Sequence, residues 1–410
     1  MSTHEPYRSL LVRGWNFAST LIDSKASAAK LSSSALLEKT AKSCSPPSLD
    51  GATLEALERL VNALNDTAEL HPFGRYYVSQ LLAGLLSNRG RLAQLWQERP
   101  EILRASTEQP LIILGLPRCG TSFLFNLLAC DPAHRYLSNW EATVSQIPPA
   151  RVRRPEQDPR RRTGQLLMHF QRHLAPQLEN IHEFHLDGPE ECTPLLMQGF
   201  DTQALAGMFN VPAFSQWLNS VEHLPTYQHH KRILQTLQSC YPATRWLLKS
   251  PDHLAATDAI LQVYPDACLV HLHRDPVQAV SSWASLNAAF RGICSARIDP
   301  QQLGEQILDR LATDMDAYLE ARPSHPPARF LDLPYQGLTA DPMQTVHSIY
   351  DYFGLELSPA AEQRMASFLV ADREKSRGHK YSPEDFGLSA GGIRERFATY
   401  MQRFDVAPPR

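Results

Sequence analysis

Two hydrophobic patterns divide the chain, and the boundary between them lies near residue 105. Residues 54–64 and 77–96 carry apolar side chains at the three- and four-residue spacing of amphipathic helices. From residue 111 onward, short apolar runs alternate with helical stretches. The pattern therefore predicts a helical N-terminal region, residues 1–105, and a domain of different construction, residues 106–410.

The short apolar runs are typical of buried strands in a parallel sheet. They cover residues 111–114, 245–248, 267–272 and 329–333, and a predicted helix follows each one. Alternation of strands with helices indicates an α/β fold, in which helices cover both faces of a central parallel sheet. Residues 143–244 interrupt the alternation and are predicted to be mainly helical insertions.

Length and composition indicate a large globular protein. At 410 residues the chain exceeds a typical domain of about 100–200 residues, and its 43% apolar and 20% charged residues exclude wholesale disorder. The net charge of −3 argues against a globally basic protein that coats nucleic acid. No run of 18 apolar residues occurs, so we expect no membrane span.

Cysteine use and the first residues bear on the compartment. The seven cysteines are scattered, and no C-x-x-C motif occurs. This pattern favours free thiols in a reducing compartment over a disulfide framework or a structural zinc site. Residues 1–6 show no basic segment followed by an apolar one, so no signal peptide is predicted and we expect a cytoplasmic protein.

A glycine-containing loop joins the first predicted strand to its helix. Residues 115–122 have the order of a P-loop, in which backbone N–H groups and a helix N-terminus surround an anion. Thr121 stands where a P-loop for nucleoside triphosphates carries lysine, and the cation Arg118 lies inside the loop. We therefore predict a P-loop-NTPase-like three-layer α/β fold without an ordinary Mg-nucleotide site. The alternative is a tight β–α turn that binds nothing.

The same loop resembles that of a known enzyme family. Its residues are Pro117, Arg118, Cys119, Gly120, Thr121, Ser122 and Phe123. They resemble the 5′-phosphosulfate loop of sulfotransferases that use 3′-phosphoadenosine 5′-phosphosulfate (PAPS). The resemblance implies that these residues contact the donor, with Arg118 in the family's cationic position and Phe123 stacked on adenine. For Phe123, a core-facing aromatic is an equally good interpretation.

A second segment resembles the part of that family that holds the 3′-phosphate. Arg274 follows a predicted strand, and Ser282 lies eight residues later on the next helix. The resemblance implies that the Arg274 guanidinium donates two hydrogen bonds to the phosphate and that the Ser282 hydroxyl contacts the same phosphate from the side. Two weaker matches follow. Tyr335 is expected near the adenine, and a buried structural tyrosine is the alternative. Lys380 is expected in a basic loop over the 3′-phosphate, and a solvated basic loop is the alternative.

Candidates for the chemical step lie in segments that resemble bacterial members of the family. Sulfuryl transfer needs positioning and charge stabilisation more than covalent chemistry, and a base for the acceptor proton. The resemblance implies that Lys249 contacts the sulfonate or bridging oxygens and that His253 is the base. The ordinary imidazole pKa of about 6.5 suits that task. A capping or core histidine is the alternative.

Two carboxylates compete with His253 for the role of base. Glu141 follows the phosphate-loop helix, where some sulfotransferases place a catalytic glutamate, and a surface glutamate is the alternative. Glu190 lies in the acidic segment 187–192, which resembles an element of the same bacterial members. One glutamate of that segment is expected in the acceptor pocket, although a carboxylate that favours a helix start explains it equally well.

Other charged clusters carry less chemistry. His271 and His273 share one strand face, but the sequence offers no evident third ligand, so we expect no metal site. The arginines between residues 151 and 162 are interpreted as a solvated basic loop.

Together these segments favour a PAPS-dependent sulfotransferase without a metal requirement. It would move a sulfuryl group from PAPS to a hydroxyl, or to an amine, of a small-molecule, lipid or carbohydrate acceptor. The second product would be 3′,5′-diphosphoadenosine (PAP), and residues 143–244 would form the acceptor side. Two alternatives stay open: a P-loop kinase that acts on a small molecule, and a nucleotide-binding module without catalysis.

Overall fold

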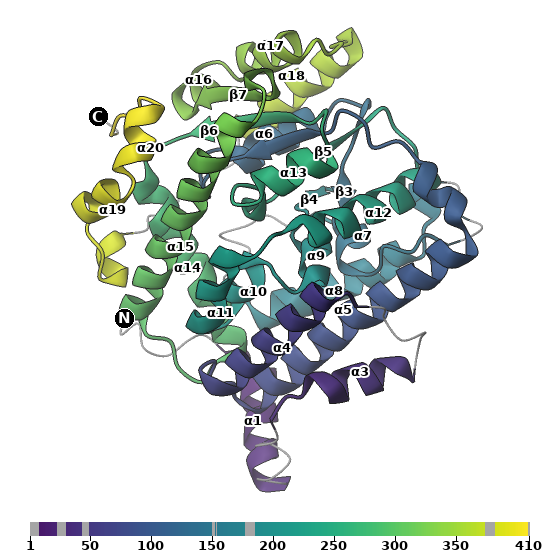
Figure 1. The fold of residues 1–410 in the computed structure, drawn as a ribbon, viewed down its shortest axis with the longest axis vertical. Coiled ribbons are helices and arrows are strands. Elements are labelled where there is room, and N and C mark those ends of the chain that lie inside the picture. Colours follow the sequence, from purple (N-terminus) through teal and green to yellow (C-terminus); the bar gives the residue numbers. More distant parts are fainter. Residues whose placement is uncertain are drawn as a thin grey trace.

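The computed structural model describes residues 8–22, 30–42, 49–149, 152, 154–176, 185–373 and 382–408. Within these ranges the chain folds around a parallel sheet with helices on both faces (Figure 1). The donor contact predicted for Lys380 lies outside the described residues.

The central sheet has the strand order β2-β5-β1-β6-β7, and each neighbouring pair is parallel. Its strands are β1 (Leu111–Leu114), β2 (His134–Arg135), β5 (Arg245–Lys249), β6 (Cys268–His273) and β7 (Phe330–Pro334). A short antiparallel pair joins β3 (Leu137–Ser138) to β4 (Pro189–Glu190). The four predicted strands are confirmed to within one residue at each end.

Burial explains why β1 stands at the centre of the sheet. All of its residues are buried, and it pairs with β5 on one side and β6 on the other. A fully buried leucine or isoleucine side chain contributes about 1.5–3 kcal/mol. Because β1 contains no polar residue, its sequence fits a strand that is covered on both faces.

Helices complete a three-layer arrangement. Figure 1 shows α6, α17 and α18 on one side of the sheet and α12, α13 and α15 on the other. These helices, together with α14, are α6 (Thr121–Leu128), α12 (Leu224–Cys240), α13 (Thr257–Val263), α14 (Pro276–Cys294), α15 (Pro300–Ala321), α17 (Pro342–Phe353) and α18 (Pro359–Arg373). The three-layer α/β fold predicted from the sequence is confirmed.

The chain connections place a binding edge at the carboxyl ends of the central strands. The chain leaves β1 through α6 toward β2, but it leaves β5 through α13 toward β6, so these crossovers run in opposite directions. Ligands of α/β sheets bind in the crevice that such a reversal creates. The phosphate loop, Lys249 and Arg274 all lie at this edge.

Other helices come from the N-terminal region, the insertion and the C-terminal part. The N-terminal ones are α1 (Leu10–Ile22), α3 (Ser33–Ala41), α4 (Gly51–Asp66) and α5 (Pro72–Glu98). The insertion contributes α7 (Asn139–Thr143), α8 (Arg160–Leu174), α9 (Thr193–Leu196), α10 (Gln203–Met208) and α11 (Pro212–Trp217). The C-terminal part contributes α16 (Tyr335–Ala340), α19 (Ala390–Arg396) and α20 (Ala398–Arg403). The helices predicted over residues 54–64 and 77–96 are confirmed.

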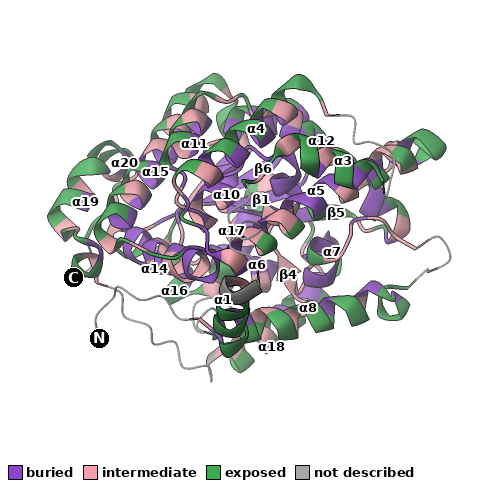
Figure 2. Ribbon diagram, turned by 90° about the horizontal axis from the view of Figure 1, so that it is seen from below, coloured by how far each residue is buried: buried purple, intermediate pink, exposed green. Residues whose placement is uncertain are grey.

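The N-terminal helices share a core with later elements. Leu60 of α4 and Leu82 of α5 are buried in a cluster that also contains Phe200 and Ile293. Figure 2 shows buried residues on α4, α5 and α10. The division of the chain at residue 105 stays a prediction. Among the described residues, no helix has the length and hydrophobicity needed to cross a membrane.

Candidate active site

The phosphate loop forms a tight curl between β1 and α6. Gly115 and Gly120 have φ values of +144° and +86°, and Arg118 between them has a φ of +65°. Backbone turned in this way directs N–H groups to one side, which forms an anion-binding concavity. The N-terminus of α6, which begins at Thr121, adds the positive end of a helix dipole. The loop therefore has the geometry that its sequence predicts.

Close neighbours make glycine necessary at two positions of the loop. A Cβ atom on Gly115 would lie 2.9 Å from the carbonyl oxygen of Leu272 in β6. A Cβ atom on Gly120 would lie 3.0 Å from the ring of Tyr335, which follows β7. A side chain at Gly115 would collide with the β6 backbone, and one at Gly120 would require the Tyr335 ring to move, so the loop packs closely against the ends of β6 and β7.

Lys249 supplies a cation beside the loop from the end of β5. The residue is buried, and its Nζ donates to Ser122 Oγ at 3.1 Å. It also forms an ion pair with Glu191. Because Thr121 occupies the P-loop lysine position, the cation next to α6 comes from the neighbouring strand instead.

Arg274 lies at the end of β6 and reaches back to the loop. Its Nη1 donates to the carbonyl oxygen of Arg118 at 2.7 Å, and its guanidinium carbon lies 3.9 Å from the centroid of the Tyr335 ring. A cation–π contact of this kind holds the planar guanidinium in place. The structure thus brings together Arg274, Tyr335 and the loop, which were proposed separately as donor contacts.

The remaining predicted donor contacts have contrasting environments. Ser282 on α14 is buried. Burial raises the pKa of the Cys119 thiol to about 12, so this thiol is not a nucleophile at neutral pH. Phe123 packs against Phe368 of α18, with ring centroids 6.1 Å apart, so its ring faces another helix.

A cavity of about 230 Å³ opens at the binding edge of the sheet. Its charged and small lining residues are Gly115, Pro117, Arg118, Thr121, Ser122, Glu190, Glu191, Thr193, Lys249, Ser250, Asp252 and Ser282. Apolar side chains from α10 and α14 also line it, namely Ala204, Met208, Trp283, Leu286 and Phe290. The apolar residues were not identified from the sequence. Two of them, Leu286 and Phe290, could have been found from the sequence, because they follow Ser282 at four-residue spacing and so share its helix face.

Two neighbouring glutamates line the cavity at the end of β4. Asn139 Nδ2 donates to Glu190 Oε2 at 2.6 Å, and the Glu191 N–H donates to Glu190 Oε1 at 3.0 Å. Glu191 pairs with Lys249, so it is joined to the cation beside the phosphate loop. Glu190 was the residue singled out from the sequence. Glu191 was not, because its partner lies 58 residues away along the chain.

His253 lies inside the fold and is not among the cavity-lining residues. The Tyr227 hydroxyl is 2.6 Å from its Nδ1. Burial, together with His230 and the charge of Lys249, holds the pKa of His253 well below its usual range, so the imidazole is neutral. The preceding residue, Asp252, lines the cavity instead. The structure therefore does not bring the imidazole to the substrate space.

Glu141 is fully buried in an internal ion pair. Its two carboxylate oxygens accept from the Arg135 guanidinium at 2.7 and 3.0 Å, and one also accepts from the Ser138 N–H at 3.2 Å. This capping box begins α7. Glu141 is absent from the cavity lining, although α7 holds Glu190 in the cavity through Asn139.

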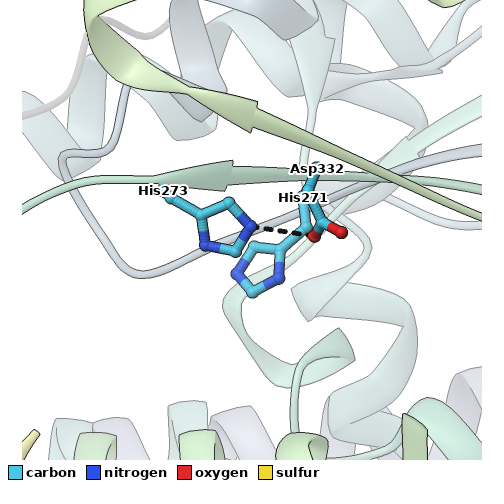
Figure 3. Close-up of side chains that lie close together, drawn as sticks. All are labelled: His271, His273 and Asp332. Atoms are coloured by element: carbon cyan, nitrogen blue, oxygen red, sulfur yellow. Dashed lines mark hydrogen bonds and ion pairs between the residues drawn. The ribbon is translucent and has the colours of Figure 1, made fainter. Parts of the chain in front are cut away.

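A polar cluster joins the paired strands β6 and β7. Figure 3 shows the rings of His271 and His273 next to the carboxylate of Asp332. His273 Nε2 is 2.9 Å from Asp332 Oδ1, and Arg322 contacts both oxygens of the same carboxylate. Asp332 is the third candidate ligand that the sequence did not reveal. Because Arg322 already neutralises Asp332, the cluster is explained as an ion-pair network that ties β6 to β7 beside Arg274.

Comparison with known proteins shows what this chain is similar to. The model of a family described as "Sulfotransferase family" matches residues 110–359. A curated relative from Mycobacterium bovis (strain ATCC BAA-935 / AF2122/97) is 26% identical over 270 residues, which are 60% of this chain and 63% of that protein. It is named omega-hydroxy-beta-dihydromenaquinone-9 sulfotransferase Stf3. The match thus spans less than two thirds of the relative's length.

Two solved structures are similar over most of the chain. Sulfotransferase STF1 from Mycobacterium tuberculosis H37Rv is 31% identical, with a TM-score of 0.79 over 90% of this chain and 99% of that one. Sulfotransferase STF9 from Mycobacterium avium is 29% identical, with a TM-score of 0.80 over 92% and 97% of the two chains. Because these shares are so large, most of the N-terminal helical region belongs to the common fold.

Proposed function

Because this chain belongs to the sulfotransferase family, we propose that it transfers a sulfuryl group from PAPS to a hydroxyl group of an acceptor. The observation that carries the proposal is the cavity in which the phosphate loop meets the Lys249–Glu191 pair. The name of the Mycobacterium bovis relative describes a hydroxyl-bearing acceptor, which supports a hydroxyl over an amine here.

The polar part of the cavity suits the anionic groups of PAPS. The curled loop, the α6 N-terminus and Arg118 offer N–H groups and positive charge to the 5′-phosphosulfate. Ser282 in the lining offers a hydroxyl to the 3′-phosphate, and Arg274, which is bonded to the loop beside the cavity, offers a guanidinium. Tyr335, stacked against Arg274, orients the guanidinium for that contact.

The Lys249–Glu191 pair supports the transfer step. In this step the acceptor oxygen bonds to sulfur while the bond from sulfur to the bridging oxygen of the 5′-phosphate breaks, and PAP leaves. Glu191 accepts the acceptor proton as general base, and Lys249 donates to the oxygens that gain charge. The contact of Lys249 with Ser122 places this pair next to the anion-binding loop.

The other candidates for the base receive supporting roles in this proposal. Glu190, held by Asn139, orients the segment that carries Glu191. Glu141 begins α7 and thereby positions Asn139. The buried side chain of His253 anchors the short turn that follows β5 in the interior.

Sulfur-labelled PAPS and one matched pair of variants test the proposal. We expect label to pass to hydroxyl acceptors. Glu191→Gln should lower kcat about 10²–10⁴-fold, the usual contribution of a general base, and leave the affinity for PAP unchanged. Glu190→Gln is the matched control and should lower kcat less. Wild-type turnover by Glu191→Gln would remove Glu191 from the role of base.

The same preparation separates the proposal from its two alternatives. A kinase would transfer phosphate from labelled ATP in the presence of Mg²⁺. A module without catalysis would bind PAP but pass no label from PAPS to any acceptor. Either result would overturn the proposed reaction.

A further inference from the structure

The cavity lining changes in character from the strand ends to the helices. Apolar side chains of α10 and α14 line it, and we call the set Ala204, Met208, Trp283, Leu286 and Phe290 the acceptor wall. The same helix, α14, carries Ser282 and most of the wall. A single rigid element therefore joins a proposed donor contact to an apolar surface.

The spacing along α14 sets the direction of the acceptor wall. Ser282, Leu286 and Phe290 are four residues apart, so they share one face of the helix. At a rise of about 1.5 Å per residue, Phe290 lies roughly 12 Å along the helix axis from Ser282. The wall thus extends in one direction away from the donor site.

The side chains of the wall are open to the cavity. Leu286 and Phe290 are partly exposed, as is Met208 of α10, whereas Val280 and Ala284 on the opposite side of α14 are fully buried. Large apolar side chains kept at the surface of a cavity favour an apolar ligand, because that ligand displaces water from them.

Charge is confined to the other part of the lining. Among the described lining residues, the cations are Arg118 and Lys249, and the carboxylates are Glu190, Glu191 and Asp252. None of these groups comes from α10 or α14. A charged acceptor body would therefore meet no counter-ion along the wall, and its desolvation would be unfavourable.

Two polar side chains on the wall's own helices, Asn287 and Gln203, also line the cavity. The Asn287 amide donates to the carbonyl oxygen of Trp283 at 2.7 Å. Gln203 at the start of α10 also lines the cavity, and its side-chain amide atoms are buried and make no hydrogen bond to the described residues. These two amides are few against the several hydroxyl groups of a sugar, most of which would lose hydrogen bonds to water without replacement.

We propose that the acceptor is an uncharged, elongated apolar molecule whose reacting hydroxyl lies at one end. This inference rests on the proposed sulfuryl transfer and specifies its acceptor. The hydroxyl lies between Glu191 and the sulfuryl group, and the hydrocarbon body lies along Leu286 and Phe290, against Met208. Transfer to the hydroxyl oxygen converts an apolar alcohol into an anionic amphiphile and leaves PAP.

A matched series of acceptors tests the inference. With PAPS as donor, geranylgeraniol is compared with the shorter geraniol, with an ω-hydroxy fatty acid and with glucose. We expect kcat/KM for geranylgeraniol to exceed each of the others about tenfold or more. Glucose or the hydroxy acid as the best acceptor would overturn the inference.

Variants of the wall test where the hydrocarbon lies. Leu286→Asn and Phe290→Asn should raise KM for geranylgeraniol about tenfold and leave the affinity for PAP unchanged. Val370→Asn, on the exposed surface of α18, is the matched control and should change neither quantity. Where an asparagine variant fails to fold, Leu286→Ala takes its place. An unchanged KM in folded wall variants overturns the inference.

Failure of the inference is distinguishable from failure of the proposed function. If PAP does not bind and no acceptor takes up label, the sulfotransferase proposal itself fails. If PAP binds and glucose is sulfated while the wall variants behave as wild type, only the inference fails. If PAP binds but no acceptor is sulfated, the proposed reaction fails, and calorimetry of geranylgeraniol with the PAP complex tests the wall by itself; absence of binding then overturns the inference as well.

Discussion

The polar part of the cavity and the acceptor wall are built in different ways. The polar part comes from short segments at the ends of β1, β4 and β5 and from Ser282 of α14, and Arg274 at the end of β6 lies beside the loop. The wall comes from faces of α10 and α14. Recognition of an anion depends on direction and charge at a few atoms, whereas apolar recognition depends on area. Single substitutions should therefore strongly lower kcat or donor affinity in the polar part but change the acceptor KM at the wall.

Loss of the Lys249 charge should have the largest effect on the polar part. Lys249→Met keeps the length of the side chain but removes the contacts with Ser122 and Glu191. Removal of one preorganised donor beside a reacting group lowers kcat about 10²–10³-fold. Single-turnover kinetics should show this loss with little change in acceptor KM. Lys39→Met, at an exposed site on α3, is the control, and a wild-type rate for Lys249→Met would contradict the assignment.

Replacement of Arg274 should affect the donor alone. Hydrogen bonds to charged groups contribute about 1.5–3 kcal/mol. Arg274→Ala removes such bonds and the contact with Tyr335, so the affinity for PAP should fall about 10–100-fold, as measured by calorimetry. Arg274→Lys keeps the positive charge but lacks the planar guanidinium, so its PAP affinity should lie between those of the wild type and Arg274→Ala. Unchanged PAP affinity in Arg274→Ala would remove this residue from the donor site.

Acid should destabilise the sheet edge that supports the polar part. Burial, with the nearby charges of His273 and Arg322, holds the pKa of His271 well below its usual range. Below about pH 6.5 the unfolded chain gains a proton there and the folded chain does not, so stability is present above that pH and falls below it. The contribution is about 1.4 kcal/mol per pH unit for such a histidine.

Urea unfolding between pH 7 and pH 5 measures this dependence. His271→Phe should reduce the slope of the unfolding free energy against pH by roughly the contribution of one histidine. His347→Phe replaces an exposed histidine on α17 and is the control. Its unfolding free energy should depend on pH nearly as steeply as that of the wild type. The same slope in His271→Phe and wild type would contradict the buried neutral imidazole.

A pair of left-handed glycines gives the smallest expected effect and the sharpest contrast. Gly120 and Gly354 both have positive φ, but a Cβ on Gly120 would touch Tyr335 while one on Gly354 meets open space. Alanine at either position should cost about 1–2 kcal/mol of stability. Only Gly120→Ala should also weaken PAP binding. Equal PAP affinity in the two variants would show that the loop tolerates a side chain there.

The sheet and the phosphate loop were predictable because each depends on a short contiguous segment. Residues 111–114 form a wholly apolar strand, and Gly115 and Gly120 mark the two turns of the loop that follows. The positions of Arg274 at a strand end and Ser282 on the next helix were predictable for the same reason, and their contacts with the donor stay a prediction. Local chemistry decides such features.

The pairing of Lys249 with Glu191, to which we assign the transfer step, could not be predicted because it joins distant segments. Glu191 meets Lys249 only when β4 lies beside the end of β5, as the bond from the Cys192 N–H to the Lys249 carbonyl oxygen shows. Glu141 is buried because it forms an ion pair with Arg135, and the sequence alone does not reveal this pairing. In the short turn after β5, Asp252 lines the cavity whereas His253 is buried. The sequence does not show which of two adjacent residues faces the cavity.

Ligand-dependent thermal unfolding tests the central claim most directly, with PAP compared against ATP and Mg²⁺. A ligand at about 100 times its Kd adds about 2.7 kcal/mol to the free energy of unfolding. We expect PAP to raise the Tm of the wild-type protein, to raise that of Arg274→Ala much less at the same concentration, and ATP with Mg²⁺ to have little effect. Stabilisation by ATP with Mg²⁺ and none by PAP would contradict a PAPS-dependent sulfotransferase.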